Sequence, residues 1–453
     1  MNLKFTLPKQ FDWVDLSNNE FNAVLNEVIT TDNNIFVQSK AGCGKSLIIK
    51  IASQMLKNVA VVTPTGSAAV QLQADGIPTG TLHSFFQLPP TSIIEQEAIL
   101  KPMNKKHRDL IRKLDVIIID EVSMISSHIF DTIMLKLMHI RGDLPRFILF
   151  GDVFQLPPVV NDRDDVIYDF YQKTYNGNIM FFNSSIYPDL NFKVMQMYHS
   201  FRQSDPEFAE NILKIGLGTA TQETLDYFNQ RVQSCQEFEK THKKYMYLAS
   251  TRKEVSTMND FYLSWIKGDE KTFIPEKSAS FPENIKEFDE PVVLKVGAQV
   301  MFTQNNRSAG YTNGTIGTVI ALNDLGADIE LLDGSVVHST YSKFDFFESY
   351  VEDSTGLIKN RLKAWVWAID CKICKAMTIN KSQGKTFEEA YIALGGWIQQ
   401  GGLYVALSRL TSLSGLGLSR PIKMSDMIIN QESKEFFEKL EKENGNSGEE
   451  NGS

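Results

Sequence analysis

The sequence predicts an α/β fold, and three short apolar runs are the main evidence. Residues 35–37, 116–119 and 147–150 each have the length and composition of a strand buried in a sheet. After the first run, a glycine turn leads into residues 45–57, whose apolar side chains recur at helical spacing. Polar side chains directly follow the other two runs, so we expect them at the same edge of the sheet.

The segment SKAGCGKS, residues 39–46, predicts a phosphate-binding loop. A strand, a glycine turn and a helix that begins with Lys-Ser form the context that such a loop requires. The backbone N–H groups of residues 42–45 can surround an anion, and the helix N-terminus adds partial positive charge. We expect Lys45 to reach the β- and γ-phosphates of a nucleoside triphosphate, and the Ser46 hydroxyl to hold Mg²⁺. The alternative is a glycine turn that only starts a helix.

Two adjacent acids, Asp120 and Glu121, end the second apolar run. In phosphate-loop enzymes such a strand end supplies a carboxylate for Mg²⁺ and a neighbouring acid that polarises the attacking water. The third run leads into GDVFQLPPV, where Gln155 has the chemistry to sense a γ-phosphate through a water. Taken singly, the acids also fit a solvated strand end, and Gln155 a surface glutamine.

Composition limits the class of protein. A chain of 453 residues predicts two to four domains. The net charge of −9 argues against a protein that coats nucleic acid, so a nucleic-acid contact would follow a confined track. No apolar run approaches the ~18 residues of a membrane span, and the N-terminus lacks the features of a signal peptide. We therefore expect a cytoplasmic protein, associated with the nucleoid if the source is bacterial.

The four cysteines are too few and too scattered for a disulfide framework. Cys371 and Cys374 form a CxxC pair without a second pair or a histidine cluster, so we expect a buried strand there and no zinc site.

Other segments differ in character. Residues 87–113 are polar and predict a projecting hairpin or helix, and short strands and helices from about residue 179 predict a second unit. Residues 292–366 carry short strands with glycine and Asn-Gly turns, which predicts a small inserted β-barrel. Residues 431–453 are charged and acidic, and we expect a disordered tail.

Ten motifs occur in the order and spacing seen in superfamily 1 helicases. They are SKAGCGKS, TPTGSAA, TLHSFF, DEVSM, GDVFQLPPV, FRQSDPEF, LKVGAQVMF, NGTIG, TINKSQGKT and YVALSR. In detail, HSFF, FRQ, GAQVM with NGTIG, and YVALSR resemble the Pif family of superfamily 1B, which are 5′-to-3′ DNA helicases. The resemblance runs from about residue 16 to residue 418.

The resemblance implies an α/β architecture of two RecA-like parallel-sheet domains with a small inserted wedge and an inserted SH3-like β-barrel. The implied boundaries are 1–178 for the first domain, with the wedge at 87–113, 179–291 and 367–430 for the second domain, 292–366 for the barrel and 431–453 for the tail.

It also implies site residues. The catalytic set would be Lys45, Asp120, Glu121, Gln155 and two arginine fingers, Arg202 and Arg409. ATP would contact Ala41, Gly42, Cys43, Gly44, Lys45, Ser46, Gln383 and Gly384, with Mg²⁺ held by Ser46 and Asp120. The role implied for the two arginines is physically reasonable, because a planar guanidinium can stabilise the charge that spreads over γ-phosphoryl oxygens.

Single-stranded DNA and tailed duplex DNA are the implied partners, with no membrane. Two roles stay open for the acidic C-terminal tail, docking of a protein partner and solubility. The implied DNA contacts are Thr65, His83, Phe85, Thr378, Asn380 and Lys381. Phe85 or Phe86 and Tyr311 are candidates for stacking on bases, since aromatic rings bind single strands with little sequence preference. Core packing explains Phe85 and Phe86 equally well.

Three positions depart from the family pattern. Glu20 stands where a glutamine usually reads adenine, and a carboxylate cannot donate to adenine N7, so nucleotide selectivity is expected to be relaxed. Ser39 replaces the first glycine of the phosphate loop, and Asn380 replaces a histidine expected on DNA.

Three functions are compatible with these residues. The first is an ATP-dependent 5′-to-3′ DNA helicase, whose family includes members that unfold G-quadruplexes. The second is a DNA clamp switched by ATP without unwinding, favoured by the three departures and the short wedge region. The third is a small-molecule kinase, which the two arginines and the second α/β unit disfavour.

Overall fold

The computed structural model describes residues 3–449 apart from 41, 67, 70, 71, 73–75, 78, 90–93, 95–98, 104, 161–164, 204, 243, 244, 282–287, 289, 305, 307, 308, 312, 313, 332, 353–356 and 397. These residues form two compact units, one of residues 1–244 with 379–453 and the other of residues 245–378. Each unit has its own hydrophobic core.

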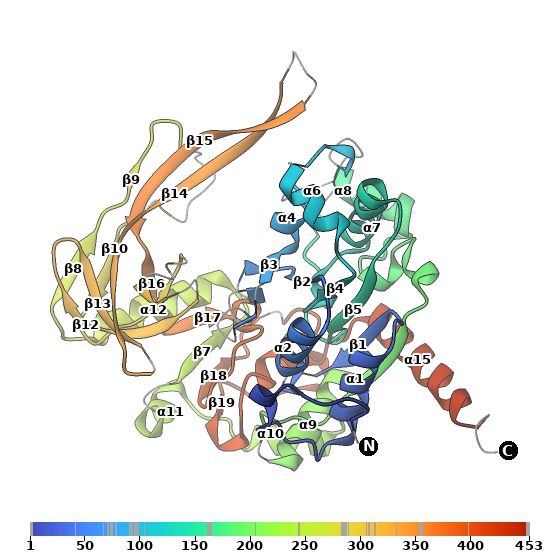
Figure 1. Ribbon diagram of the computed structural model, residues 1–453. Helices are drawn as coiled ribbons and strands as arrows, with labels where there is room; N and C mark the ends of the chain where they lie inside the picture. Colours follow the sequence, from blue (N-terminus) through green and yellow to red (C-terminus); the bar gives the residue numbers. More distant parts are fainter. Residues whose placement is uncertain are drawn as a thin grey trace. The chain divides into compact units, whose positions relative to one another are not determined.

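A six-stranded parallel sheet forms the centre of the first unit, in the order β3-β2-β4-β5-β1-β6 (Figure 1). Its strands are β1 (Ile35–Ser39), β2 (Val59–Thr63), β3 (Thr79–Thr81), β4 (Val116–Ile119), β5 (Arg146–Gly151) and β6 (Lys193–Met197). All residues of β1 and β4 are buried, as their apolar composition predicts. The α/β prediction is therefore confirmed.

Helices connect these strands and form much of the rest of the first unit. They are α1 (Asn19–Thr30), α2 (Lys45–Met55), α4 (Leu82–Phe85), α6 (Lys105–Arg112), α7 (Ser127–Arg141), α8 (Asp165–Tyr175), α9 (Pro206–Leu217), α10 (Gln222–Asn229), α11 (Cys235–Thr241), α13 (Ile379–Ser382), α14 (Gly402–Leu407) and α15 (Gln431–Glu449). Strands β18 (Ala390–Ala393) and β19 (Leu416–Leu418) form a further parallel pair. Of the predicted wedge at 87–113, the structure describes α6, while residues 90–93, 95–98 and 104 lie outside the described residues.

The second domain was predicted to begin at residue 179, which would place β6 in that domain. This assignment of β6 is wrong. This strand pairs in parallel with β1 over the whole length of β1, from Ile35 with Lys193 to Ser39 with Met197. Its sequence alone does not say which sheet it joins, because the pairing partner lies more than 150 residues upstream. The other predicted boundaries of the second domain stay predictions.

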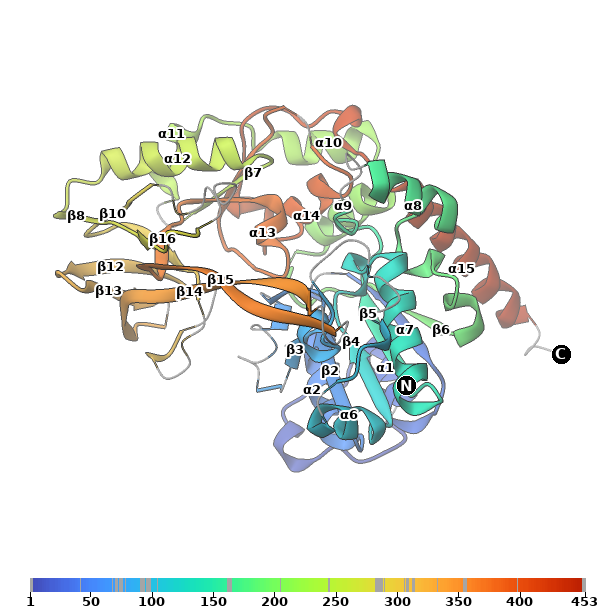
Figure 2. The ribbon, with the colours of Figure 1, turned by 90° about the horizontal axis from the view of Figure 1, so that it is seen from above.

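The expectation of a disordered tail is also wrong for the beginning of residues 431–453. Helix α15 starts at Gln431, and its Phe437 and Leu440 are buried. Phe436 stacks face to face on Phe182 with ring centroids 4.0 Å apart, and Asn183 Nδ2 donates to Glu432 Oε2 at 2.7 Å. The end of the helix extends away from the first unit's sheet (Figures 1 and 2).

The second unit is built on an antiparallel sheet in the order β16-β11-β12-β13-β14-β15-β9. Its strands are β9 (Glu276–Lys277), β11 (Gln299–Phe302), β12 (Ile316–Leu322), β13 (Gly326–Leu331), β14 (Val336–Glu352), β15 (Leu357–Ile369) and β16 (Cys371–Ile373). Strands β8 (Glu270–Phe273) and β10 (Val292–Lys295) form an antiparallel pair, and β7 (Met246–Ala249) and β17 (Ala376–Thr378) a parallel one. The curled antiparallel sheet fits the predicted barrel, but β9 and β16 lie outside the predicted boundaries of 292–366.

Helix α12 (Arg252–Trp265) lies along one side of the strands of the second unit (Figure 2). Its Tyr262 and Leu263 pack against the barrel core. Cys371 lies in β16 and both cysteines of the CxxC pair are buried, as the strand prediction expected. In the part of the chain that the structure describes, no helix has the length and apolar character needed to cross a membrane.

Candidate active site

The phosphate loop has the predicted strand–turn–helix geometry. Strand β1 ends at Ser39, and Gly44 caps the N-terminus of α2 with a φ of +84°. Gly42 also has a positive φ of +83°, a conformation that glycine adopts without strain. Ser39 belongs to the extended strand, so replacing the usual glycine requires no special backbone there. Ala41 lies outside the described residues.

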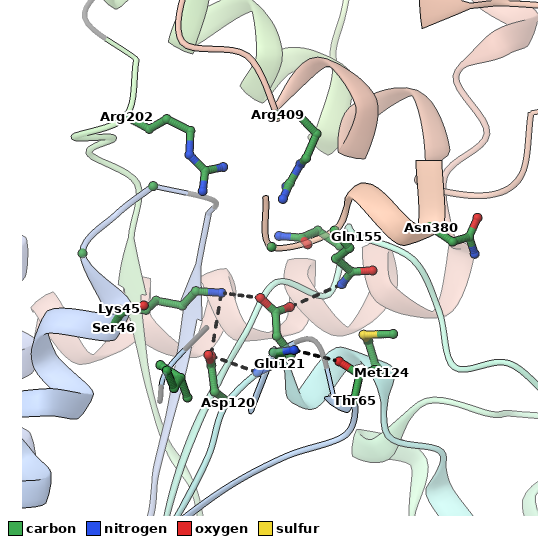
Figure 3. Close-up of a pocket in the computed structure, with 16 residues that line it drawn as sticks. Lys45, Ser46, Thr65, Asp120, Glu121, Met124, Gln155, Arg202, Asn380 and Arg409 are labelled. Carbon is green, nitrogen blue, oxygen red and sulfur yellow. Dashed lines mark hydrogen bonds and ion pairs between the residues drawn. The ribbon is translucent and has the colours of Figure 1, made fainter. Parts of the chain in front are cut away.

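A cavity of about 170 Å³ lies beside this loop (Figure 3). Most of the residues predicted for ATP and catalysis line it: Gly42, Gly44, Lys45, Ser46, Asp120, Glu121, Gln155, Arg202, Gln383, Gly384 and Arg409. Thr65, Ala68, Leu72, Met124 and Asn380 complete the lining. The Cys43 side chain instead packs in the hydrophobic core, where burial raises the pKa of its thiol to about 12. The thiol therefore stays neutral.

Lys45, Asp120 and Glu121 form a buried charged cluster at the end of β4. Lys45 Nζ lies 3.4 Å from Glu121 Oε1 and 3.9 Å from Asp120 Oδ1. Burial raises the pKa of Asp120 to about 6, and the neighbouring charge of Glu121 acts in the same direction. Burial would also raise the pKa of Glu121, but the charges of Lys45 and Arg409 lower it below its usual value. The two acids thus have different proton affinities in one pocket.

Asp152, at the end of β5, organises the loop that carries Gln155. Its Oδ2 accepts hydrogen bonds from Gln155 Nε2 at 3.2 Å and from the Tyr404 hydroxyl at 2.6 Å. Its Oδ1 accepts from Gln38 Nε2 at 3.0 Å. Gln155 Oε1 is buried and has no hydrogen-bond partner among the residues described. An unsatisfied buried acceptor in a cavity wall indicates a ligand or water there.

Arg202 and Arg409 point toward the cavity from the side opposite Asp120 (Figure 3). Arg202 Nη1 donates to the carbonyl of Ser408 at 3.0 Å, and Arg409 Nε donates to the carbonyl of Val405 at 2.9 Å. Burial lowers the pKa of Arg409 to about 10, and the charge of Arg202 adds to this shift. Both side chains remain cations at neutral pH, so an anion in the cavity would relieve their repulsion.

Glu20 has a structural role that the sequence did not indicate. Its Oε2 accepts hydrogen bonds from the backbone N–H groups of Tyr198, at 2.8 Å, and His199, at 2.9 Å. These bonds fix the segment that leads to Arg202. A glutamine oxygen accepts the same bonds, so this role explains why either residue fits here.

The predicted DNA contacts belong to both units. Thr65 and His83 line a second hollow of about 350 Å³ together with Pro64, Leu82, Val159 and Tyr171. Burial lowers the pKa of His83, so the imidazole is neutral at pH 7. Asn380 lines the first cavity, which Thr65 also lines, and its Oδ1 accepts from Gln399 Nε2 at 2.8 Å. Lys381 is exposed on α13, and Thr378 lies in β17 of the second unit.

The three candidates for stacking on DNA bases differ in how deeply their rings are buried. Phe86 is fully buried, and Phe85 is partly buried with its ring against Phe86 and His107. The proposal of Tyr311 as a stacking residue is wrong, because its ring is 2% exposed and lies on Phe302 with centroids 3.8 Å apart. Tyr404 begins the motif YVALSR, but its role was not predicted from the sequence, because its partner Asp152 lies about 250 residues away in the chain.

Comparisons with known proteins agree with this geometry. A family model described as "PIF1-like helicase" matches residues 16–226. An ATP-dependent DNA helicase Pif1 of Campylobacter jejuni is 27% identical over 406 residues, covering 85% of this chain and 88% of that protein. A protein of the same name from Bdellovibrio bacteriovorus is 28% identical over 423 residues, covering 89% of this chain and 88% of that protein.

Solved structures agree as well. The crystal structure of Bacteroides Pif1 bound to ssDNA matches with a TM-score of 0.81 and 28% identity, over 96% of this chain and 99% of that one. The Bacteroides complex with ADP-AlF3 and ssDNA matches with a TM-score of 0.80 and 28% identity, over 96% and 99%. The predicted fold class of RecA-like parallel sheets and an inserted barrel-like domain is thereby confirmed. The model of PIF1-like helicases thus matches residues 16–226, and the whole chain is similar in sequence and fold to Pif1 helicases.

Proposed function

We propose that this chain is an ATP-dependent DNA helicase that moves 5′-to-3′ along single-stranded DNA and separates duplex DNA. The observation that carries the proposal is the composition of the cavity wall: one phosphate loop, two acids, a glutamine with an unpartnered oxygen, the buried Arg409 and the half-buried Arg202. Together these parts can bind phosphates, hold a metal ion, orient a water and stabilise charge, which are the tasks of triphosphate hydrolysis. Relatives named ATP-dependent DNA helicase Pif1 cover most of the chain, and a Bacteroides relative was solved with ADP-AlF3 and ssDNA.

Lys45 and the N–H groups of the loop would bind the β- and γ-phosphates. Glu121, the acid whose pKa is lowered, is suited to accept a proton from the attacking water. Gln155 Oε1 would orient that water, because its amide nitrogen is already held by Asp152. Arg202 and Arg409 would stabilise the negative charge of the transition state.

The donor set also fits Mg²⁺. Ser46 and Asp120 line the same cavity and offer a hydroxyl and a carboxylate oxygen, the hard ligands that this ion prefers. Ser46 and Asp120 would hold the ion where its charge could offset part of the negative charge of the phosphates. Since burial raises the pKa of Asp120, a cation beside this carboxylate would favour its ionised form.

Single-stranded DNA would run through the hollow at Thr65 and His83. This hollow offers a hydroxyl, a neutral imidazole and apolar side chains such as the 85%-exposed Val159. Such groups bind phosphates by hydrogen bonds and bases by contact, which an acidic chain can do without a basic surface. Phe85, Thr378, Asn380 and Lys381 are proposed as further contacts. The 5′-to-3′ direction rests on the family resemblance, and a protein partner at the C-terminal segment stays a prediction.

The test is ATP hydrolysis with and without a single-stranded oligonucleotide, in the wild type and in Lys45→Ala. We expect strong stimulation by DNA and loss of hydrolysis in the variant. Hydrolysis that ignores DNA would contradict the proposal and favour a kinase-like enzyme. Tight DNA binding without turnover would favour the ATP-switched clamp.

A further inference from the structure

Helix α14 touches the loop of Gln155 at two points. The first is Gly401, immediately before the helix, which has a φ of +69°. A Cβ at this position would lie 2.6 Å from the carbonyl oxygen of Gln155 and 2.8 Å from that of Phe154. The backbone of residue 401 therefore packs directly on the backbone of the loop, and only glycine allows this approach.

The second point is the Tyr404 hydroxyl, which donates to Asp152 Oδ2 at 2.6 Å. This is the same oxygen that accepts from Gln155 Nε2. Since an ionised carboxylate only accepts hydrogen bonds, the amide nitrogen of Gln155 must face Asp152, and Oε1 must face away. That oxygen is the buried acceptor without a partner among the described residues.

Tyr404 is itself held rigidly. It is 4% exposed, and a Cβ on Gly216 of α9 would lie 2.8 Å from its ring, so that ring is closely packed. Burial and the charge of Asp152 raise the pKa of the phenol well above its usual value. The hydroxyl therefore remains a hydrogen-bond donor across the physiological pH range.

The same helix leads into the arginine cluster. Arg409 follows the C-terminal end of α14 and its Nε donates back to the carbonyl of Val405, one residue after Tyr404. Arg202 Nη1 donates to the carbonyl of Ser408. A shift of α14 would therefore move both arginines and, through the hydroxyl, Asp152 and Gln155.

We propose that Tyr404 is a positioning residue for ATP hydrolysis, which through Asp152 sets the orientation of the Gln155 amide and couples it to the helix of Arg409. The proposal rests on the proposed ATPase function. Tyr404 does not line the cavity, so its effect would be on turnover and not on ATP binding.

The experiment compares Tyr404→Phe, which removes only the hydroxyl, with Tyr175→Phe. Tyr175 is the matched control because it is also buried and also donates to a carboxylate, Asp131 Oδ2 at 2.9 Å, outside the cavity. We expect Tyr404→Phe to lower kcat about tenfold or more, because a misplaced catalytic group costs up to ~10²-fold. The KM for ATP should stay within about twofold and Tyr175→Phe should match the wild type in both parameters.

Two further variants make the test independent of folding losses. Gln155→Ala combined with Tyr404→Phe should be no slower than Gln155→Ala alone, because both changes remove the same function. Asp152→Asn should lower kcat to a similar degree, because an amide nitrogen at this position turns the Gln155 amide over.

Equal kcat values for Tyr404→Phe and Tyr175→Phe would overturn the proposal, and so would additive losses in the double variant. Each rate is measured with and without DNA. If hydrolysis does not respond to DNA, the helicase function fails, while the comparison of the two tyrosine variants still decides the role of Tyr404.

Discussion

Lys45 Nζ lies 3.4 Å from Glu121 Oε1, inside a pocket where both side chains are about 90% buried. Asp120 Oδ1 lies 3.9 Å from the same nitrogen. The cation expected on phosphate and the two acids expected on metal and water therefore form one ionic cluster. A substitution in this cluster should be able to lower ATP turnover without abolishing ATP binding. It should also be able to lower turnover while it raises the stability of the fold.

Glu121→Gln should lower ATP turnover by about 10²-fold to 10⁴-fold, the range for loss of a general base. ATP binding should persist, because the amide keeps the shape of the side chain and its contact with Lys45. Turnover is measured in a single-cycle hydrolysis assay and binding by titration with a fluorescent nucleotide. Glu210→Gln, an exposed glutamate paired with Lys214, is the control. A variant with wild-type turnover would exclude Glu121 as the base.

Asp120→Asn should stabilise the protein when nucleotide and Mg²⁺ are left out of the buffer. Burial raises the pKa of Asp120 to about 6, above its value in the unfolded chain. The stability contributed by the protonated carboxyl is thus complete at low pH and is lost as the pH rises through 6. The gain for the variant should be on the order of 1 kcal/mol at pH 7.5 and smaller at pH 5.

Thermal unfolding at the two pH values measures this difference. The variant should at the same time lose Mg²⁺-dependent hydrolysis. A lower melting temperature of Asp120→Asn at pH 7.5 would contradict the assigned direction of the pKa shift.

Arg202→Lys and Arg409→Lys should each lower kcat about 10²-fold or more, since lysine cannot reproduce the planar guanidinium. Arg231→Lys is the matched control, because Arg231 also donates to backbone carbonyls, those of Leu416 and Ser414, outside the cavity. Steady-state hydrolysis at saturating DNA measures the effect. Unchanged kcat in either cavity variant would remove that residue from the arginine-finger role.

Phe436→Ala should destabilise the first unit by about 1–2 kcal/mol, because it removes a stacked ring pair from a half-buried site. The pair is Phe436 on Phe182, with planes 2° apart. Urea unfolding of the variant is compared with Glu438→Ala, an exposed change on the same helix. If both variants unfold at the same urea concentration, α15 does not dock as described.

Local patterns predicted the parts of the site that lie next to each other in the sequence. Lys45 and Ser46 follow a glycine turn, and Asp120 and Glu121 end an apolar run, so each pair is visible within ten residues. The bond between Tyr404 and Asp152 was not predictable in this way, because it depends on the packing of distant segments.

The expectation that residues 431–453 are disordered failed for a different reason. Phe436, Phe437 and Leu440 are spaced for one face of a helix, but the surrounding glutamates and glycines favoured disorder. Burial against Phe182 and Phe154 supplies the stabilisation that the local sequence lacks. Tyr311 was a candidate for stacking on DNA bases, but its ring is buried against Phe302. An aromatic residue near a glycine turn has the same sequence pattern in both cases.

The most direct test of the central claim is strand separation on DNA duplexes with a single 5′ or 3′ tail, with ATP and Mg²⁺ present. We predict that the wild type separates the 5′-tailed duplex, that the 3′-tailed duplex stays paired, and that Lys45→Ala separates neither. Separation of only the 3′-tailed duplex would contradict the proposed direction. ATP hydrolysis stimulated by DNA with both duplexes left intact would contradict the helicase itself.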